Sequence, residues 1–118
     1  MPHNLQFSLA HTYDTRLTGI QVPVIIRSGS YATELYARVD TGASFCIFER
    51  QHGDKIGLDI EQGRPVEIST VAGAFLNYAH EVTLIVLGIE TITTVYFAAD
   101  ENFSRNVLGR QGWLDRVR

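Results

Sequence analysis

Residues 35–48 read LYARVDTGASFCIF and place one acidic residue, Asp40, between two apolar segments. Before Asp40 the apolar and polar side chains alternate, which predicts a half-buried strand. Phe45 to Phe48 is continuously apolar, which predicts a short strand buried on both faces. A carboxylate beside a core is costly unless it is hydrogen-bonded. Because Thr41 offers a hydroxyl donor and Gly42 allows a tight turn that presents backbone amides, the segment predicts a deliberately positioned carboxylate.

A simpler interpretation of the same residues is an Asx-turn, in which the Asp40 side chain bonds its own backbone between two strands. The tripeptide Asp-Thr-Gly alone is too short to decide between this structural role and a chemical one, so the choice depends on the rest of the chain.

Most of the remaining sequence also predicts strands. Alternation predicts one strand over residues 20–26 and a second over 31–39, joined by a turn at 28–30. Further strands are predicted over 65–70, 75–78, 81–87 and 91–98, of which the first two form a β-hairpin around the tip 71–74. Residues 49–56 are expected to hold one turn of helix, and 110–116 a short C-terminal helix. We therefore expect one all-β domain over residues 1–118, a small closed barrel.

The bulk composition excludes several classes of function. The 118 residues are 45% hydrophobic and 19% charged, an ordinary globular balance. The formal net charge is -3, so the composition does not show the excess of positive charge that is typical of proteins that bind nucleic acid. Cys46 is the single cysteine, so no internal disulfide is possible. The N-terminus lacks a secretory pattern and the apolar runs are far shorter than a membrane span, so we expect a cytoplasmic protein without membrane contact.

A second motif, Asn106-Val107-Leu108-Gly109-Arg110, lies near the C-terminus. An apolar pair followed by Gly-Arg, behind an apolar Asp-Thr-Gly strand, resembles the retropepsins, the single-domain aspartic proteases of retroviral type. The hairpin lies between the two motifs, where that family carries its flap, and its tip comprises Thr70, Val71, Ala72, Gly73 and Ala74. The resemblance spans roughly Ile20 to Asp115. It implies an acid-protease barrel with a hairpin flap and one short C-terminal helix.

The resemblance also implies a role for each matching residue. Asp40 would be the catalytic aspartate, Thr41 would hydrogen-bond the partner chain across a two-fold axis, and the Gly42 carbonyl would bind the substrate backbone. Active-site support would come from Thr41, Gly42, Ala43, Ser44, Gly109 and Arg110. The flap would close over a peptide substrate. Because an aspartic protease needs two carboxylates and only Asp40 lies in such a turn, activity implies a homodimer, with no metal and no cofactor.

Two features depart from the viral pattern. Viral retropepsins usually carry Asp where this chain has Ser44, and that Asp pairs with the Gly-Arg arginine, so Arg110 is expected to bond backbone carbonyls instead. Only Val117 and Arg118 follow the predicted helix, too few for the family's last strand. The N-terminal extension, residues 1–19, alternates at Leu5, Phe7 and Leu9, and we hypothesise that it contributes to the dimer interface. In its length and its C-terminal tail, this chain resembles the retropepsin-like proteases encoded by bacteria more than the viral enzymes.

The sequence also leaves alternatives to an aspartic endopeptidase open. The main alternative is a non-catalytic dimerisation or peptide-binding module on the same fold, favoured by the missing last strand. A generic barrel with an incidental Asp-Thr-Gly is a further one. A Cys-His hydrolase built from Cys46 with His52 or His80 is disfavoured, because Cys46 lies inside an apolar run. The four histidines show no ligand-like spacing, so no metal site is expected.

Overall fold

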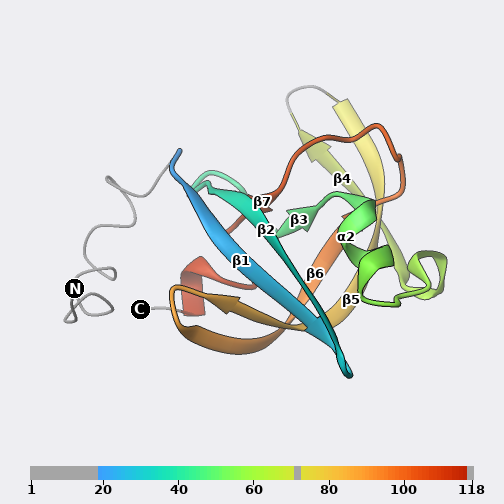
Figure 1. The fold of residues 1–118 in the computed structure, drawn as a ribbon. Helices are drawn as coiled ribbons and strands as arrows, with labels where there is room; N and C mark the ends of the chain where they lie inside the picture. Colours follow the sequence, from blue (N-terminus) through green and yellow to red (C-terminus); the bar gives the residue numbers. More distant parts are fainter. Residues whose placement is uncertain (1–18, 71–72, 117–118) are drawn as a thin grey trace.

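The computed structural model describes residues 19–70 and 73–116, which form a twisted, β-rich structure (Figure 1). The strands are β1 (Gln21–Ser28), β2 (Tyr31–Val39), β3 (Ile47–Phe48), β4 (Arg64–Thr70), β5 (Gly73–Val86), β6 (Ile89–Ala98) and β7 (Val107–Leu108). The helical segments are α2 (Arg50–Lys55), η2 (Ile60–Gln62) and η3 (Leu114–Arg116). In the described ranges, no helix is long and apolar enough to cross a membrane. The all-β prediction is confirmed.

The sheet closes on itself. β1 pairs with β2, β2 with β7, β7 with β3, β3 with β6, and β6 with β5, while the end of β5 returns to pair with β1. The barrel is uneven, because β3 and β7 contribute only two residues each. Of the described strands, β4 lies outside this ring and pairs with β5 as a projecting hairpin (Figure 1).

Strands β1 and β2 follow the predicted alternation. Their inward side chains are fully or almost fully buried, namely Val22, Val24, Ile26, Leu35, Ala37 and Val39. Burying one large aliphatic side chain stabilises a fold by about 1.5–3 kcal/mol. The same core includes Phe48 of β3, Leu84 of β5 and Phe97 of β6. Because Val39 belongs to this core, the carboxyl end of β2 is firmly anchored just before Asp40.

Strand β5 is continuous where the sequence predicted two strands. Its buried side chains are Asn77 and Ala79 in the first half and then Val82, Leu84 and Val86 in the second, so the buried face changes between 79 and 82. The sequence pattern breaks at that point, but the ladder to β6 runs unbroken from Asn77 to Val86. The buried side chains therefore move from one face of β5 to the other without a bulge or a turn in the strand.

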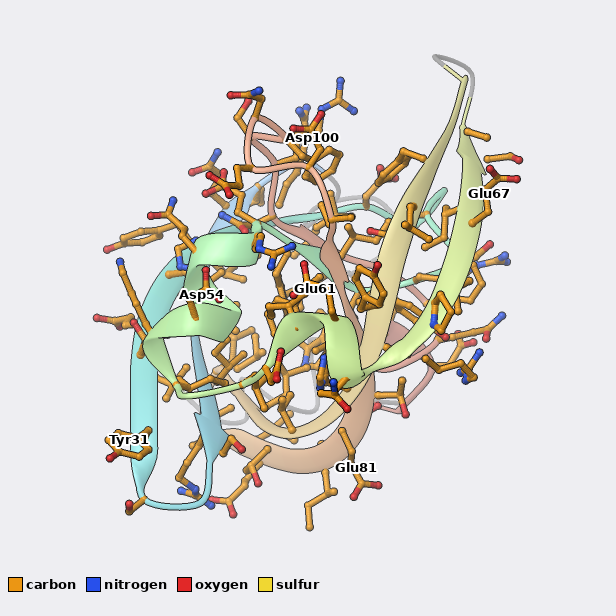
Figure 2. The ribbon with its side chains drawn as sticks, turned by 90° about the vertical axis from the view of Figure 1, so that its right-hand side faces the viewer. Tyr31, Asp54, Glu61, Glu67, Glu81 and Asp100 are labelled. Carbon is orange, nitrogen blue, oxygen red and sulfur yellow. The ribbon has the colours of Figure 1, made fainter. Side chains whose placement is uncertain are left out.

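A small layer of helix covers one face of the sheet, and Figure 2 looks onto it, with Asp54 of α2 and Glu61 of η2 in front. Helix α2 confirms the predicted turn of helix. Arg50 of α2 forms a salt bridge to Glu61. His80 of β5 donates from Nε2 to the Ile60 carbonyl over 2.9 Å. The first contact joins α2 to η2, and the second attaches the layer to β5.

The predicted C-terminal helix is present but shorter than expected. Instead of spanning 110–116 it is a single 3-10 turn, η3. Gly112 has φ +104°, a left-handed conformation that interrupts an α-helix at this point. The interruption lets Trp113 and Leu114 turn inward, where both are completely buried. Core packing of these two side chains therefore determines where the helix begins.

Candidate active site

Asp40 directly follows β2, and its backbone is fixed by the parallel pairing of β2 with β7. The register places Val39 opposite Leu108, and the Asp40 N–H donates to the Leu108 carbonyl over 3.1 Å. The Asp40 side chain is half-buried. The carboxylate thus stands at the rim of the core rather than inside it, where a ligand can reach it.

The Asp-Thr-Gly segment is a tight turn around this carboxylate. The Ala43 N–H donates to the Asp40 carbonyl (3.1 Å), and the Gly42 N–H donates to Asp40 Oδ1 (2.9 Å). The Asx-turn geometry expected from the simpler interpretation is therefore present. It occupies Oδ1, whereas Oδ2 has no hydrogen-bond partner among the described residues. Oδ1 is therefore held by the turn, and Oδ2 is available to bind another group.

The second sequence motif lies directly behind this turn. The Arg110 N–H donates to the Ala43 carbonyl (3.0 Å), and the Gln111 N–H donates to the Ser44 carbonyl (2.9 Å). Gly109 is buried, and a Cβ there would stand only 2.3 Å from the backbone oxygen of Phe45. Because no side chain fits in that space, a glycine is required where the chain passes behind the Asp40 turn.

The backbone and the side chain of Arg110 have different surroundings. Its backbone makes the bonds to the turn, whereas its guanidinium is exposed and has no hydrogen-bond or carboxylate partner within the part of the chain that the structure describes. Ser44 is half-buried and contributes its carbonyl. The expected bonds from the Arg110 side chain to backbone carbonyls are not found among the described residues, so that role of the guanidinium stays a prediction.

The hairpin formed by β4 and β5 brings the predicted flap residues to one end of the molecule. Thr70 pairs with Gly73 and Ser69 with Ala74, while Val71 and Ala72 lie outside the described residues. The ring of Phe75 stacks on that of Phe103, with centroids 4.9 Å apart. This contact connects the hairpin to the loop 99–106, which leads into β7.

A hollow of about 670 Å³ opens beside Asp40. It is lined by residues in or next to β1 and β2, by the residue before α2, and by the loop before β7 with the first residue of that strand. These residues are Gly19, Gln21, Tyr36, Arg38, Val39, Asp40, Glu49, Ser104, Arg105, Asn106 and Val107. Sequence reasoning identified Asp40 but missed Arg38 and Arg105. Arg38 could have been found, since it lies two positions before Asp40 and on the exposed face of the strand. Arg105 reaches the site through tertiary pairing alone.

Glu49 connects this hollow to helix α2. Its N–H donates to Asn106 Oδ1 (2.9 Å), and its Oε1 lies 3.4 Å from Nε2 of the buried His52. Burial lowers the pKa of the His52 imidazole below its ordinary value of about 6.5, although the neighbouring Glu49 carboxylate acts in the opposite direction. His52 is therefore neutral at pH 7.

This pKa shift predicts a pH dependence of stability. Below about pH 6.5 the unfolded chain takes up a proton that the folded His52 resists, so the free energy of unfolding should fall as the pH is lowered. The variant His52→Leu should show a shallower decline between pH 6.5 and 5 in urea denaturation followed by circular dichroism. Identical slopes for the two proteins would contradict the assignment.

The described residues hold no group of three or more His, Cys, Asp or Glu side chains that could bind a metal ion. The chemistry available in this region is that of the Asp40 carboxylate, the exposed arginines and backbone amides.

Comparison with known proteins agrees with this geometry. A family model described as aspartyl protease matches residues 14–111. Among solved structures, the EIAV protease in complex with the inhibitor HBY-793 superposes with a TM-score of 0.61 and 22% identity, over 81% of this chain and 86% of that one. At such identity the likeness concerns the fold alone. A search of curated proteins gave no significant match. This chain therefore belongs to the aspartyl protease family and has the retropepsin fold.

Proposed function

We propose that this protein is a homodimeric aspartic endopeptidase whose catalytic dyad forms from Asp40 of two chains. Family and fold support aspartic protease activity in general. The observation that carries the finer proposal is the state of the Asp40 carboxylate. It is half-buried, held at one oxygen by the Gly42 N–H, and borders an open hollow. A turn with a purely structural role would not need its carboxylate to be open to a hollow on the surface.

The need for a second chain follows from the chemistry. Peptide hydrolysis of this type uses one carboxylate as a base towards water and a second, protonated one to polarise the carbonyl. Within the described ranges, Asp54, Asp59 and Asp115 lie on or beside helical turns, and Asp100 lies in the loop 99–106. None of these aspartates lines the hollow. Glu49 does line it, but its Oε1 accepts a hydrogen bond from Gln51 Nε2 and lies 3.4 Å from His52 Nε2, on the side of helix α2. A two-fold symmetric pair supplies the missing group from an identical turn.

In the proposed dimer the two carboxylates share one proton, because like charges ~3 Å apart cannot both ionise, as in aspartic proteases generally. The ionised member takes a proton from water as the water oxygen attacks the scissile carbonyl carbon. The protonated member donates to the carbonyl oxygen, giving a gem-diol. In its collapse the C–N bond breaks, and the carboxyl that took the water proton gives it to the leaving amine. The other carboxylate takes a proton back from a gem-diol hydroxyl, which leaves a carboxylic acid product and restores the singly protonated pair.

The neighbouring residues have supporting roles in this proposal. Thr41 would hydrogen-bond the partner at the base of the dyad, and the Gly42 carbonyl would bind the substrate backbone. The hairpin tip, Thr70 to Ala74, would cover the peptide and exclude water. Gly109 and the Arg110 backbone would keep the catalytic turn rigid.

The dimer makes a prediction that a monomeric enzyme would not. Below the dimer dissociation constant, cleavage per molecule should rise in proportion to protein concentration, because active dimers form as its square. Adding a ninefold excess of Asp40→Asn to a tight wild-type dimer should lower activity to about a tenth, because nearly every wild-type chain then has an inactive partner. Fluorogenic peptides from a mixed library would report both effects.

The control for this mixing experiment is the same excess of an unrelated folded protein, which should leave cleavage unchanged. Activity that is strictly proportional to concentration and indifferent to the variant would exclude the shared dyad. Well-folded protein that cuts no peptide at any concentration would favour a non-catalytic peptide-binding or dimerisation module.

A further inference from the structure

We propose that the hollow beside Asp40 makes this enzyme select peptides with an acidic residue, Asp or Glu, next to the scissile bond. This inference rests on the proposed endopeptidase function and adds a substrate class to it. It comes from two arginines, Arg38 and Arg105, which line the hollow and have no part in the proposed chemistry of the dyad.

The first arginine is placed by the strand that carries the catalytic residue. Arg38 is the last but one residue of β2, on its exposed face, and Asp40 directly follows the strand. That face is the one that lines the hollow, since Arg38, Asp40 and the exposed Tyr36 all border it. A substrate held against Asp40 would therefore bring its neighbouring side chain towards the Arg38 guanidinium.

The second arginine is fixed against the first by backbone contacts. The Arg38 N–H donates to the Asn106 carbonyl over 2.8 Å, and Asn106 Oδ1 accepts from the Glu49 N–H. These bonds hold the segment carrying Arg105 beside β2. Two arginines thus line one hollow from segments far apart in the chain.

The charge of these arginines is not neutralised by the described part of the protein. Neither has a carboxylate of the described residues within 4.0 Å. Glu49, the other acid that lines the hollow, directs its Oε1 to Gln51 Nε2 (2.8 Å) and to the His52 ring. In a chain of net charge -3, the hollow thus holds two cations without a direct carboxylate partner among the described residues.

An acidic substrate residue fits this site chemically. A guanidinium binds a carboxylate through two parallel N–H···O bonds, and such charge-assisted bonds are stronger than neutral ones. Without the arginines, the negative charge of the dyad would repel the same carboxylate. Arg38 and Arg105 are therefore specificity residues, and their removal should abolish the preference for an acid or reverse it.

The test uses a peptide that the wild-type enzyme cuts, found from a mixed library. Copies are made with Glu or Gln at each position within two residues of the cut, and kcat/KM is measured at pH 6.5, where peptide Glu is ionised. We expect one position to favour Glu over Gln by roughly tenfold, the combined effect of two partly solvated ion pairs. The preference should weaken at 1 M salt, where exposed charges are screened.

Variants connect the preference to the hollow. Arg38→Gln and Arg105→Gln should each lower the Glu/Gln ratio, and the double variant should bring it to one or below. Arg27→Gln is the matched control, because Arg27 pairs with Glu90 near the β1–β2 turn, at the end of the molecule where Figure 2 labels Tyr31. It should keep the wild-type ratio. Circular dichroism would check that each variant is folded.

Three results would overturn the inference. They are equal cutting of the Glu and Gln peptides by wild-type protein, a preference that does not respond to salt, and an unchanged ratio in the folded double variant. In each case peptides are still cut, so the proposed function would stand while the substrate class fails. Absence of cleavage of any peptide would instead remove the proposed function, and this inference with it.

Discussion

Asp40→Asn should lower peptide hydrolysis by about a thousandfold or more, because the amide can neither accept the proton of the attacking water nor share a proton with its partner. The fold should survive the change. Asparagine keeps a side-chain oxygen in the place of Oδ1, which accepts the hydrogen bond from the Gly42 N–H. The measurement is kcat/KM on a fluorogenic peptide, with the denaturation midpoint recorded for both proteins.

Asp54→Asn is the matched control for this loss. The chemical change is the same, but Asp54 is exposed on α2, in the helical layer seen in Figure 2, and does not line the hollow beside Asp40. It should cut peptides at the wild-type rate. Comparable activity in Asp40→Asn and Asp54→Asn would show that the observed hydrolysis does not come from this turn.

Gly109→Ala should destabilise the folded protein by about 3 kcal/mol or more, the upper range for inserting an atom where a packed structure has no space. The new Cβ would meet the backbone O, C and N of Phe45 at 2.3, 2.6 and 2.7 Å. That backbone cannot withdraw easily, because the adjacent bonds from Arg110 N to Ala43 O and from Gln111 N to Ser44 O fix both segments. Urea denaturation gives the free energy of unfolding.

Gly53→Ala provides the comparison within the same chain. Its Cβ would lie 2.5 Å from the terminal methyl of Ile60, a flexible side-chain end, and at 3.1 Å or more from Phe97. Ile60 can change rotamer, and alanine favours a helix by up to about 1 kcal/mol over glycine, so the net change should stay within about 1 kcal/mol. Equal losses in the two variants would show that Phe45 is not the obstacle that Gly109 avoids.

Local pattern predicted much of the fold. Period-two alternation identified β1 and β2, and small residues between two strand-like runs identified the β4–β5 hairpin. The same reasoning failed where the buried face of a segment changes along its length. In β5 the buried face changes after Ala79, so the pattern breaks although the strand does not. At the C-terminus, Trp113 turns into the core and leaves only η3 of the expected helix.

The candidate site, too, was predicted from the sequence only in part. By itself the sequence determined the Asp40 turn, the Gly109 motif and the retropepsin-like family, because each is carried by residues next to one another in the chain. Only the tertiary structure decided that Arg110 bonds the turn through its backbone while its side chain faces solvent. It alone brought Arg38 and Arg105 into one hollow beside Asp40. Pairing between distant segments depends on the whole sheet, and no local spacing specifies it.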